Sequence, residues 1–307
     1  MNDGGRDAHV ACFDTPVLRV QDVGPHVRRI TFGGPELERF GVPEPALDLR
    51  VKLLLPTSSS PVPGIGETGV ALPHDWYQQW LLRPEPGRGA IRSYTVRGFR
   101  RGTDGFELDV DFVVREAGGP GSTWARSAVP GSRALIIGPT SEAAAGALAH
   151  TRCGITWTPG PANDVLLAGD ETAVPAITAM LETLPARFTG NAFLEVPDAG
   201  DVQQFPGHPG IRTHWLIRNS SGVGHGQLLL AAVKNSVTEQ ERGPEYAWIA
   251  GEASVVTGMR RYLVRDRGMD RNNVTFRGYW SAGKSGSGVN GIPDKPRPGL
   301  NYSGSDE

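Results

Sequence analysis

Cysteine is scarce in this sequence of 307 residues, which contains only Cys12 and Cys153. Two cysteines exclude a disulfide framework and any four-cysteine iron–sulfur or zinc site built within one chain. The seven histidines show no metal-ligand spacing, such as two on one face of a helix, so we predict no resident metal. There is no G-x-S-x-G motif, and we propose no catalytic nucleophile. Any iron that takes part in the function must therefore arrive already chelated.

Long hydrophobic runs and an excess of one charge are also missing. No apolar stretch approaches the roughly 20 residues that span a bilayer, and residues 1–6 lack the hydrophobic segment of a secretory signal. We therefore expect a cytoplasmic protein without a membrane partner. The 31 Lys and Arg are balanced by 33 Asp and Glu, which does not favour nucleic acid as a partner. We expect a monomer that binds a small molecule.

Glycine and proline are abundant, at 41 and 25 residues, so turns and loops should outnumber long helices. The chain is too long for one hydrophobic core, and we expect two domains. In the first, residues 15–139, short runs with the period-two alternation of strands predict a small Greek-key β-barrel. The expected strands are 16–23, 26–32, 50–55, 91–98, 106–114 and 134–138, the fifth with one wet face. The aromatic segment 57–88 is either a lid or a short helix that patches the barrel.

The pattern changes to alternating strands and helices after a linker at residues 140–163. Residues 164–284 predict a parallel α/β sheet, with strands at 164–169, 192–196, 212–217, 246–250 and 274–279 and helices at 175–184, 226–233 and 255–267. Ligands of such sheets bind beyond the carboxyl ends of the strands. The segments 169–175, 251–252 and 278–283 follow three strands, so they should share that edge. Residues 285–307 should form a flexible tail.

The most informative stretch is residues 92–97, Arg-Ser-Tyr-Thr-Val-Arg. As a strand, it places Arg92, Tyr94 and Val96 on one side. An arginine fork suits a pyrophosphate, and a tyrosine ring can lie against a flavin ring system. A flavin site is one interpretation, and a strand with two solvated arginines and a half-buried tyrosine is the other.

Residues 118–125 form a second candidate for phosphate binding. Glycines there allow the backbone to approach a ligand closely. Either Ser122 or Thr123 can cap a helix that starts at Trp124, whose own side chain we expect to pack. The segment is therefore either part of a cofactor site or a turn before a short helix.

Residues 169–175 end a strand and begin a helix without the G-x-G-x-x-G fingerprint of dinucleotide sites. Asp170 and Thr172 either cap this helix or bind a phosphate or ribose at its positive end. At the end of the last strand, Tyr279 and Trp280 either cover a flavin or nicotinamide ring or join the two domains.

These segments, in this order, resemble the siderophore-interacting protein family, the flavin-dependent ferric-siderophore reductases related to ferredoxin reductases. The resemblance covers most of the chain, through residues 17–32, 51–55, 92–97, 119–125, 169–177, 248–252 and 278–280. It implies an FAD-binding barrel and an NAD(P)H-binding α/β domain, with NADH or NADPH, or ferredoxin instead, as electron donor. A flavin is the required mediator, because nicotinamide delivers two electrons and ferric iron accepts one.

The resemblance also implies the roles of individual residues, and none of them is catalytic because the flavin carries the chemistry. Cofactor binding is implied for Arg92, Ser93, Tyr94, Thr95, Val96, Arg97, Arg115, Gly119, Pro120, Ser122, Ala125, Asp170, Thr172, Ala173, Tyr279 and Trp280. Nicotinamide binding is implied for Gly169, Gly251 and Glu252, and binding of the ferric siderophore for Lys52. Arg115 and Lys284 are further basic candidates for binding an anionic chelate, with Lys284 as a replacement for the arginine that the family has at residue 281.

Two residues depart from the family pattern. Ser281 stands where the family continues Tyr-Trp with arginine, and Arg115 stands where relatives usually have histidine. The leading hypothesis is an NAD(P)H-dependent ferric-siderophore reductase. One alternative is a flavin reductase or electron-transfer flavoprotein that acts on another acceptor. A non-catalytic protein that binds flavin or siderophore is the other.

Overall fold

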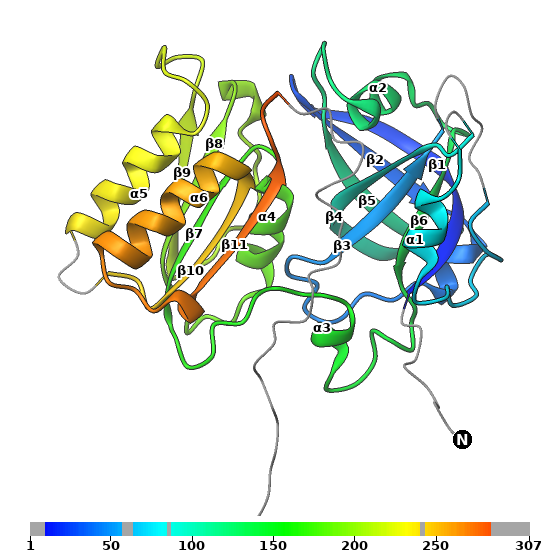
Figure 1. Cartoon of the computed structure of the whole chain (residues 1–307), viewed down its shortest axis with the longest axis horizontal. Coiled ribbons are helices and arrows are strands. Elements are labelled where there is room, and N and C mark those ends of the chain that lie inside the picture. The colour runs from blue at the N-terminus through cyan, green and yellow to red at the C-terminus, as the bar shows by residue number, and fades with distance from the viewer. Residues whose placement is uncertain (1–9, 57–63, 85–86, 240–242, 284–307) are drawn as a thin grey trace, which may run out of the picture.

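The computed structural model describes residues 10–56, 64–84, 87–239 and 243–283. A β-barrel and an α/β sheet lie side by side, and a segment that includes α3 (Ala149–Arg152) joins them (Figure 1). Within the described ranges, none of the helices is both long and apolar enough to cross a membrane.

The first unit is a closed antiparallel barrel with the strand order β1-β2-β5-β4-β3-β6. Its strands are β1 (Val10–Gly24), β2 (Val27–Gly33), β3 (Arg50–Leu55), β4 (Ala90–Gly102), β5 (Gly105–Val113) and β6 (Arg133–Pro139). The predicted barrel is therefore confirmed. Apolar side chains of the alternating strands meet inside it, where residues such as Ile30, Leu53 and Val110 are fully buried.

The polar face of β5 differs from the prediction of a wet surface. Asp109 and Asp111 on this face are each only 6% exposed. The Nε atom of Arg29, from β2, lies 2.6 Å from Oδ1 of Asp111, and Arg100, from β4, pairs with Asp109. Neighbouring strands thus cover these carboxylates with arginine side chains.

Short helices close the barrel. Helix α1 (Trp76–Leu81) packs Trp80 against Leu54 and Leu135, as expected for a helix that patches the barrel. Helix α2 (Pro120–Ser127) begins four residues before the predicted start, with Gly119 as its N-cap and no side-chain cap. A 3₁₀ turn, η1 (Pro35–Arg39), follows β2.

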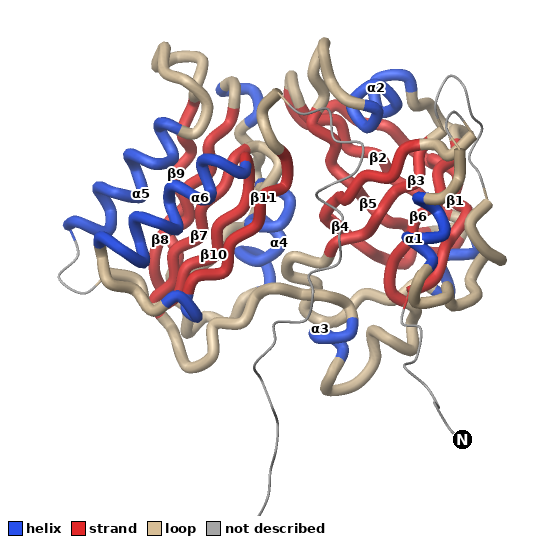
Figure 2. The backbone as a smooth tube through the Cα atoms, in the orientation of Figure 1, coloured by secondary structure: helices blue, strands red, loops and turns tan. Residues whose placement is uncertain are grey.

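The second unit is a parallel sheet with the strand order β11-β10-β7-β8-β9. Its strands are β7 (Asp164–Asp170), β8 (Thr189–Val196), β9 (Ile211–Ile217), β10 (Tyr246–Glu252) and β11 (Val274–Trp280). Helices α5 (Gln227–Glu239) and α6 (Ala253–Arg261) cover one face, and α4 (Val174–Thr183) lies on the other (Figure 2). A π-helical turn, Tyr262–Asp266, continues α6, and short 3₁₀ turns lie at Ala199–Asp201 and Arg271–Asn273. The predicted α/β architecture is confirmed.

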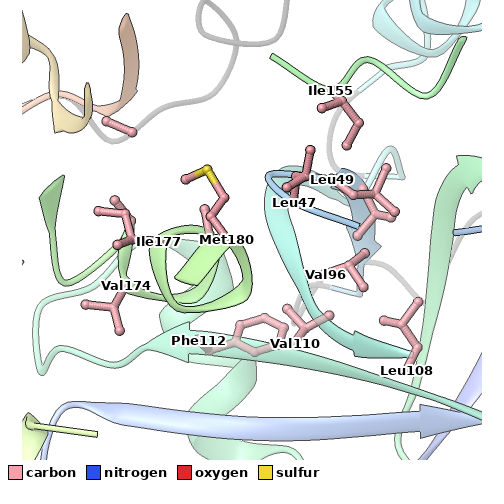
Figure 3. Close-up of a cluster of buried hydrophobic side chains, with 14 of the residues drawn as sticks. Leu47, Leu49, Val96, Leu108, Val110, Phe112, Ile155, Val174, Ile177 and Met180 are labelled. Atoms are coloured by element: carbon pink, nitrogen blue, oxygen red, sulfur yellow. The ribbon is translucent and has the colours of Figure 1, made fainter. Parts of the chain in front are cut away.

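One hydrophobic core runs from the barrel into the sheet. Figure 3 shows barrel residues such as Val96 and Phe112 in the same cluster as Val174, Ile177 and Met180 of α4. Helix α4 lies between the sheet and the barrel (Figure 1), so it gives both units a common apolar surface.

Polar contacts also join the two units. The carboxylate of Asp48, fully buried, accepts hydrogen bonds from the backbone of Thr156 at 3.0 Å and of Trp157 at 3.2 Å. On the other side, Nδ1 of His26 lies 2.8 Å from Oδ2 of Asp201. A site between the two units is therefore held by contacts on both sides.

Candidate functional site

A cavity of about 450 Å³ opens where the barrel meets the carboxyl edge of the sheet. Its lining includes ten residues that we expected to bind the cofactor: Arg92, Ser93, Tyr94, Thr95, Arg115, Gly119, Ser122, Thr172, Tyr279 and Trp280. It also includes Arg50 and Asp111, which we did not predict. Segments that are far apart in the sequence thus meet at one place.

The expected site residues that do not line this cavity are Lys52, Val96, Arg97, Pro120, Ala125, Gly169, Asp170, Ala173, Gly251 and Glu252. The side chains of Val96, Ala125 and Ala173 are buried in the core. Arg97 instead pairs with Glu182 of α4, with 2.7 Å between Nη2 and Oε1. Lys284 and the expected tail lie outside the described residues.

Tyr94 is held between the cavity and the barrel core. Its ring centroid lies 4.3 Å from that of Phe112. A Cβ atom at Gly121 would lie 2.0 Å from its hydroxyl, so only glycine fits beside this ring. Burial raises the pKa of Tyr94 above its usual range, and the side chain stays neutral. Trp124, as expected, packs: its ring stacks on Phe32.

Positive charge borders the cavity, and the carboxylate of Asp111, which also lines it, is already paired with Arg29. Among the described residues, no ion pair involves Arg50, Lys52 or Arg92, whereas other arginines of the barrel are paired. Burial lowers the pKa of Arg92 and, together with Arg50, that of Lys52. Lys52 lies beside the cavity, with Nζ 3.4 Å from the hydroxyl of Ser93 and 5.5 Å from the centroid of the Tyr77 ring. An anionic ligand would relieve this excess of charge.

The turn before α2 presents backbone to the same cavity. The hydroxyl of Ser122 accepts a hydrogen bond from the backbone nitrogen of Arg115 at 2.8 Å and donates to its carbonyl at 3.1 Å. Gly118 fits closely here, because a Cβ atom would lie 2.3 Å from that hydroxyl. A Cβ atom at Gly119 would meet nothing within 4 Å, so this backbone is open to a ligand at the start of the helix.

Asp170 joins the ends of three strands and is not the cap of α4. Its Oδ1 accepts a hydrogen bond from the backbone of Thr172 at 2.9 Å. Its Oδ2 accepts from the backbone of Glu252 at 2.8 Å and from the indole Nε1 of Trp280 at 2.9 Å. The N-cap of α4 is Ala173, without a side-chain cap. Of the two expected ligands, Thr172 lines the cavity and Asp170 orients Trp280.

The glycines and Glu252 at this edge have structural contacts. A Cβ atom at Gly169 would lie 2.4 Å from that of Ala173, and Gly251 adopts a φ of 145° beside Asp170. Glu252 caps α6 by accepting hydrogen bonds from the backbone of Ser254 at 2.7 Å and of Val255 at 3.1 Å. Nicotinamide binding by these three residues stays a prediction.

Arg115 spans the cavity from the barrel to the sheet. Its Nη2 lies 2.6 Å from Oε1 of Glu171, and its guanidinium carbon lies 4.3 Å from the centroid of the Trp280 ring. The hydroxyl of Tyr279 is buried beside Thr95, and burial raises its pKa to about 12. Ser281 also lines the cavity.

A charged cluster at the sheet edge was missed by sequence reasoning. Nη1 of Arg218 lies 2.8 Å from Oε1 of Glu195 and 3.4 Å from Oε2 of Glu171. Nε2 of His225 lies 3.5 Å from Oε2 of Glu171 and 3.5 Å from Oδ2 of Asp170. Arg218 directly follows β9, and a charge at the carboxyl end of a predicted strand was the available signal.

The cluster controls the ionisation of its members. Burial alone would raise the pKa of Glu171, but His225, Arg218 and Arg115 together lower it to about 2. Burial would lower the pKa of His225, but Glu171 and Asp170 raise it. Glu171 is therefore ionised near neutral pH. We assign no metal to Asp170, Glu171 and His225, because arginines already supply the positive charge.

Comparisons with known proteins agree with this geometry. Residues 16–143 match the family model described as a siderophore-interacting FAD-binding domain. Residues 162–283 match the model described as siderophore-interacting protein. The ferric vibriobactin reductase ViuB of Vibrio cholerae is 30% identical over 268 residues, which are 87% of this chain and 89% of that protein.

Two solved structures are similar along nearly their whole length. A siderophore utilization protein from T. fusca is 30% identical, with a TM-score of 0.66, over 90% of this chain and 95% of that chain. The siderophore-interacting protein SipS from Aeromonas hydrophila is 30% identical, with a TM-score of 0.61, over 89% of this chain and 93% of that chain. The chain therefore belongs to the siderophore-interacting protein family, and its barrel is an FAD-binding domain.

Proposed function

We propose that this protein is a cytoplasmic reductase of ferric siderophores, with FAD in the cavity and with NADH or NADPH as electron donor at the carboxyl edge of the sheet. One observation supports it above the others: a cavity bordered by unpaired arginines lies between an FAD-binding domain and the edge where an α/β sheet binds ligands. The 30% sequence identity with the ferric vibriobactin reductase ViuB supports a ferric siderophore as the electron acceptor.

The residues around the cavity fit FAD. In this proposal, Arg50 and Arg92 bind the pyrophosphate, since neither has a carboxylate partner among the described residues and both line the cavity. The open backbone at Gly119 contributes further donors. The hydroxyl of Tyr279, which lines the cavity beside Thr95, donates a hydrogen bond to the cofactor.

The protein need not supply a catalytic side chain. A bound FAD would supply the redox chemistry that links a two-electron nicotinamide donor to a one-electron ferric acceptor. Tyr94 and Trp280 exclude water from the cavity, and Arg115 and Asp170 hold Trp280 in place. Lys52, beside the cavity, attracts an anionic chelate toward it. Iron leaves the siderophore as the ferrous ion, which hard oxygen ligands bind more weakly.

The test compares FAD binding and iron release in Arg92→Met and Arg133→Met. Arg133 is the matched control, because its side chain is 51% exposed and pairs with Asp14 on the outside of the barrel. We expect Arg92→Met to raise the Kd for FAD by at least about tenfold, the loss of one charge-assisted contact. We expect Arg133→Met to leave it unchanged.

Iron release is then followed with a ferrous-iron trap in the presence of NADH or NADPH and a ferric hydroxamate siderophore. Trapped ferrous iron that depends on Arg92 and not on Arg133 supports the proposal. If the protein binds FAD and is reduced by NADH or NADPH but does not reduce the ferric iron of the siderophore, it is an electron-transfer flavoprotein. A protein that binds FAD and is not reduced is a binder.

A further inference from the structure

The strand order fixes the direction in which a dinucleotide lies along the sheet edge. In the order β11-β10-β7-β8-β9, the chain adds β8 and β9 on one side of β7 and then returns to add β10 and β11 on the other side. The switch point therefore lies between β10 and β7, and ligands of such sheets bind across it. The cavity and Trp280 lie on the β11 side. A nicotinamide ring that reaches the cavity therefore leaves the adenosine half on the β8 and β9 side.

The arginine at that end is already occupied. Arg218, directly after β9, contacts Glu195 at 2.8 Å and Glu171 at 3.4 Å. The side chains of both glutamates are at most 1% exposed. Glu195 also accepts hydrogen bonds from the backbone of Gly226 at 2.7 Å and Leu229 at 3.0 Å, which fixes it at the start of α5. Moving Arg218 to a new anion would take from the buried Glu195 the cation that pairs with it.

The exposed loop that follows supplies no other cation. Residues 219–224 are Asn-Ser-Ser-Gly-Val-Gly, and all six are exposed. The hydroxyls of Ser220 and Ser221 donate to backbone carbonyls at 3.0 Å and 2.6 Å. The amide of Asn219 suits a neutral ribose hydroxyl. The 2′-phosphate of NADPH adds about −1.5 to −2 charge units near pH 7. Among the described residues of this loop there is no lysine or arginine to pair with it.

We propose that this end of the sheet selects NADH over NADPH, with the Glu195–Arg218–Glu171 chain as the element that withholds positive charge from a 2′-phosphate. This inference rests on the proposed function, because it takes a nicotinamide as the donor. Arg218 acts here as a positioning residue for the two glutamates and not as a phosphate ligand.

The experiment measures FAD reduction by NADH and by NADPH in the FAD-loaded protein, together with the Kd values of NAD⁺ and NADP⁺ by calorimetry. We expect kcat/KM to favour NADH by at least about tenfold, the value of one missing charge-assisted contact. Asn219→Arg adds a cation in the exposed loop. We expect it to lower the ratio of kcat/KM for NADH to kcat/KM for NADPH by about fivefold. Asn235→Arg is the matched control, since Asn235 is exposed on α5 and away from this edge.

Equal or better use of NADPH by the wild-type protein overturns the inference and leaves the proposed reductase intact. Narrowing of the preference to the same extent by Asn219→Arg and Asn235→Arg also overturns it, because the loop would then have no specific role. NADH preference without iron release supports the inference and removes the proposed acceptor. Failure of both NAD⁺ and NADP⁺ to bind refutes the inference together with the nicotinamide donor.

Discussion

Replacing Arg115 with methionine should destabilise the junction of the two units, because it removes a charge that compensates the buried Glu171. The side chain of Glu171 is 1% exposed and that of Arg115 is 39% exposed. Breaking a fully buried pair costs about 3–5 kcal/mol, which solvent at Arg115 and the remaining partners of Glu171 reduce to about 1–2 kcal/mol. Loss of the contact with Trp280 adds about 0.5–1 kcal/mol.

We therefore expect Arg115→Met to lower the free energy of unfolding by about 2 kcal/mol in urea titrations. A double-mutant cycle with Glu171→Gln should give a coupling energy of about 1 kcal/mol. Arg133→Met is the control and should change stability by less than about 0.5 kcal/mol, since its partner Asp14 is also solvated. An additive cycle, or an Arg115→Met protein as stable as the wild type, would refute this account of the junction.

Two further predictions follow from the same region. Gly121→Ala places a Cβ atom 2.0 Å from the hydroxyl of Tyr94. We therefore expect the free energy of unfolding to fall by about 1–3 kcal/mol and FAD to bind more weakly in a fluorescence titration. An unchanged stability together with an unchanged FAD affinity would contradict this packing. Glu171 and Asp170 raise the pKa of His225. The stability that the charged His225 contributes to the fold is therefore complete below the ordinary pKa of histidine, and it is lost as the pH rises through the raised pKa. His225→Gln should therefore cost more stability at about pH 5.5 than at about pH 8.5; an equal cost at both would show that His225 does not titrate against Glu171.

Alternation and turn residues were sufficient to predict the elements that surround the cavity. The strand at residues 50–55 was predicted to the residue, and the one that contains Tyr94 was recognised with shorter bounds than β4 (Ala90–Gly102) has. Both have apolar faces that only the barrel interior can bury. The start of α2 was placed too late, because Ser122 resembles an N-cap in sequence but bonds to the backbone of Arg115.

The charged cluster was not predictable in the same way. Glu171, Glu195 and Arg218 follow or end three different strands, and only the parallel register brings them together. For the same reason, the sequence of β5 predicted a solvated face for Asp109 and Asp111, which the structure buries. Their arginine partners come from neighbouring strands, whose register a local pattern does not contain.

The most direct test of the central claim is the visible absorption spectrum of the purified protein under nitrogen, followed through addition of NADH and then of a ferric hydroxamate siderophore with a ferrous-iron trap. We predict a flavin spectrum that bleaches with NADH and returns with the siderophore while trapped ferrous iron appears. A colourless protein that takes up no added FAD would contradict the account of the cavity and the proposed function together.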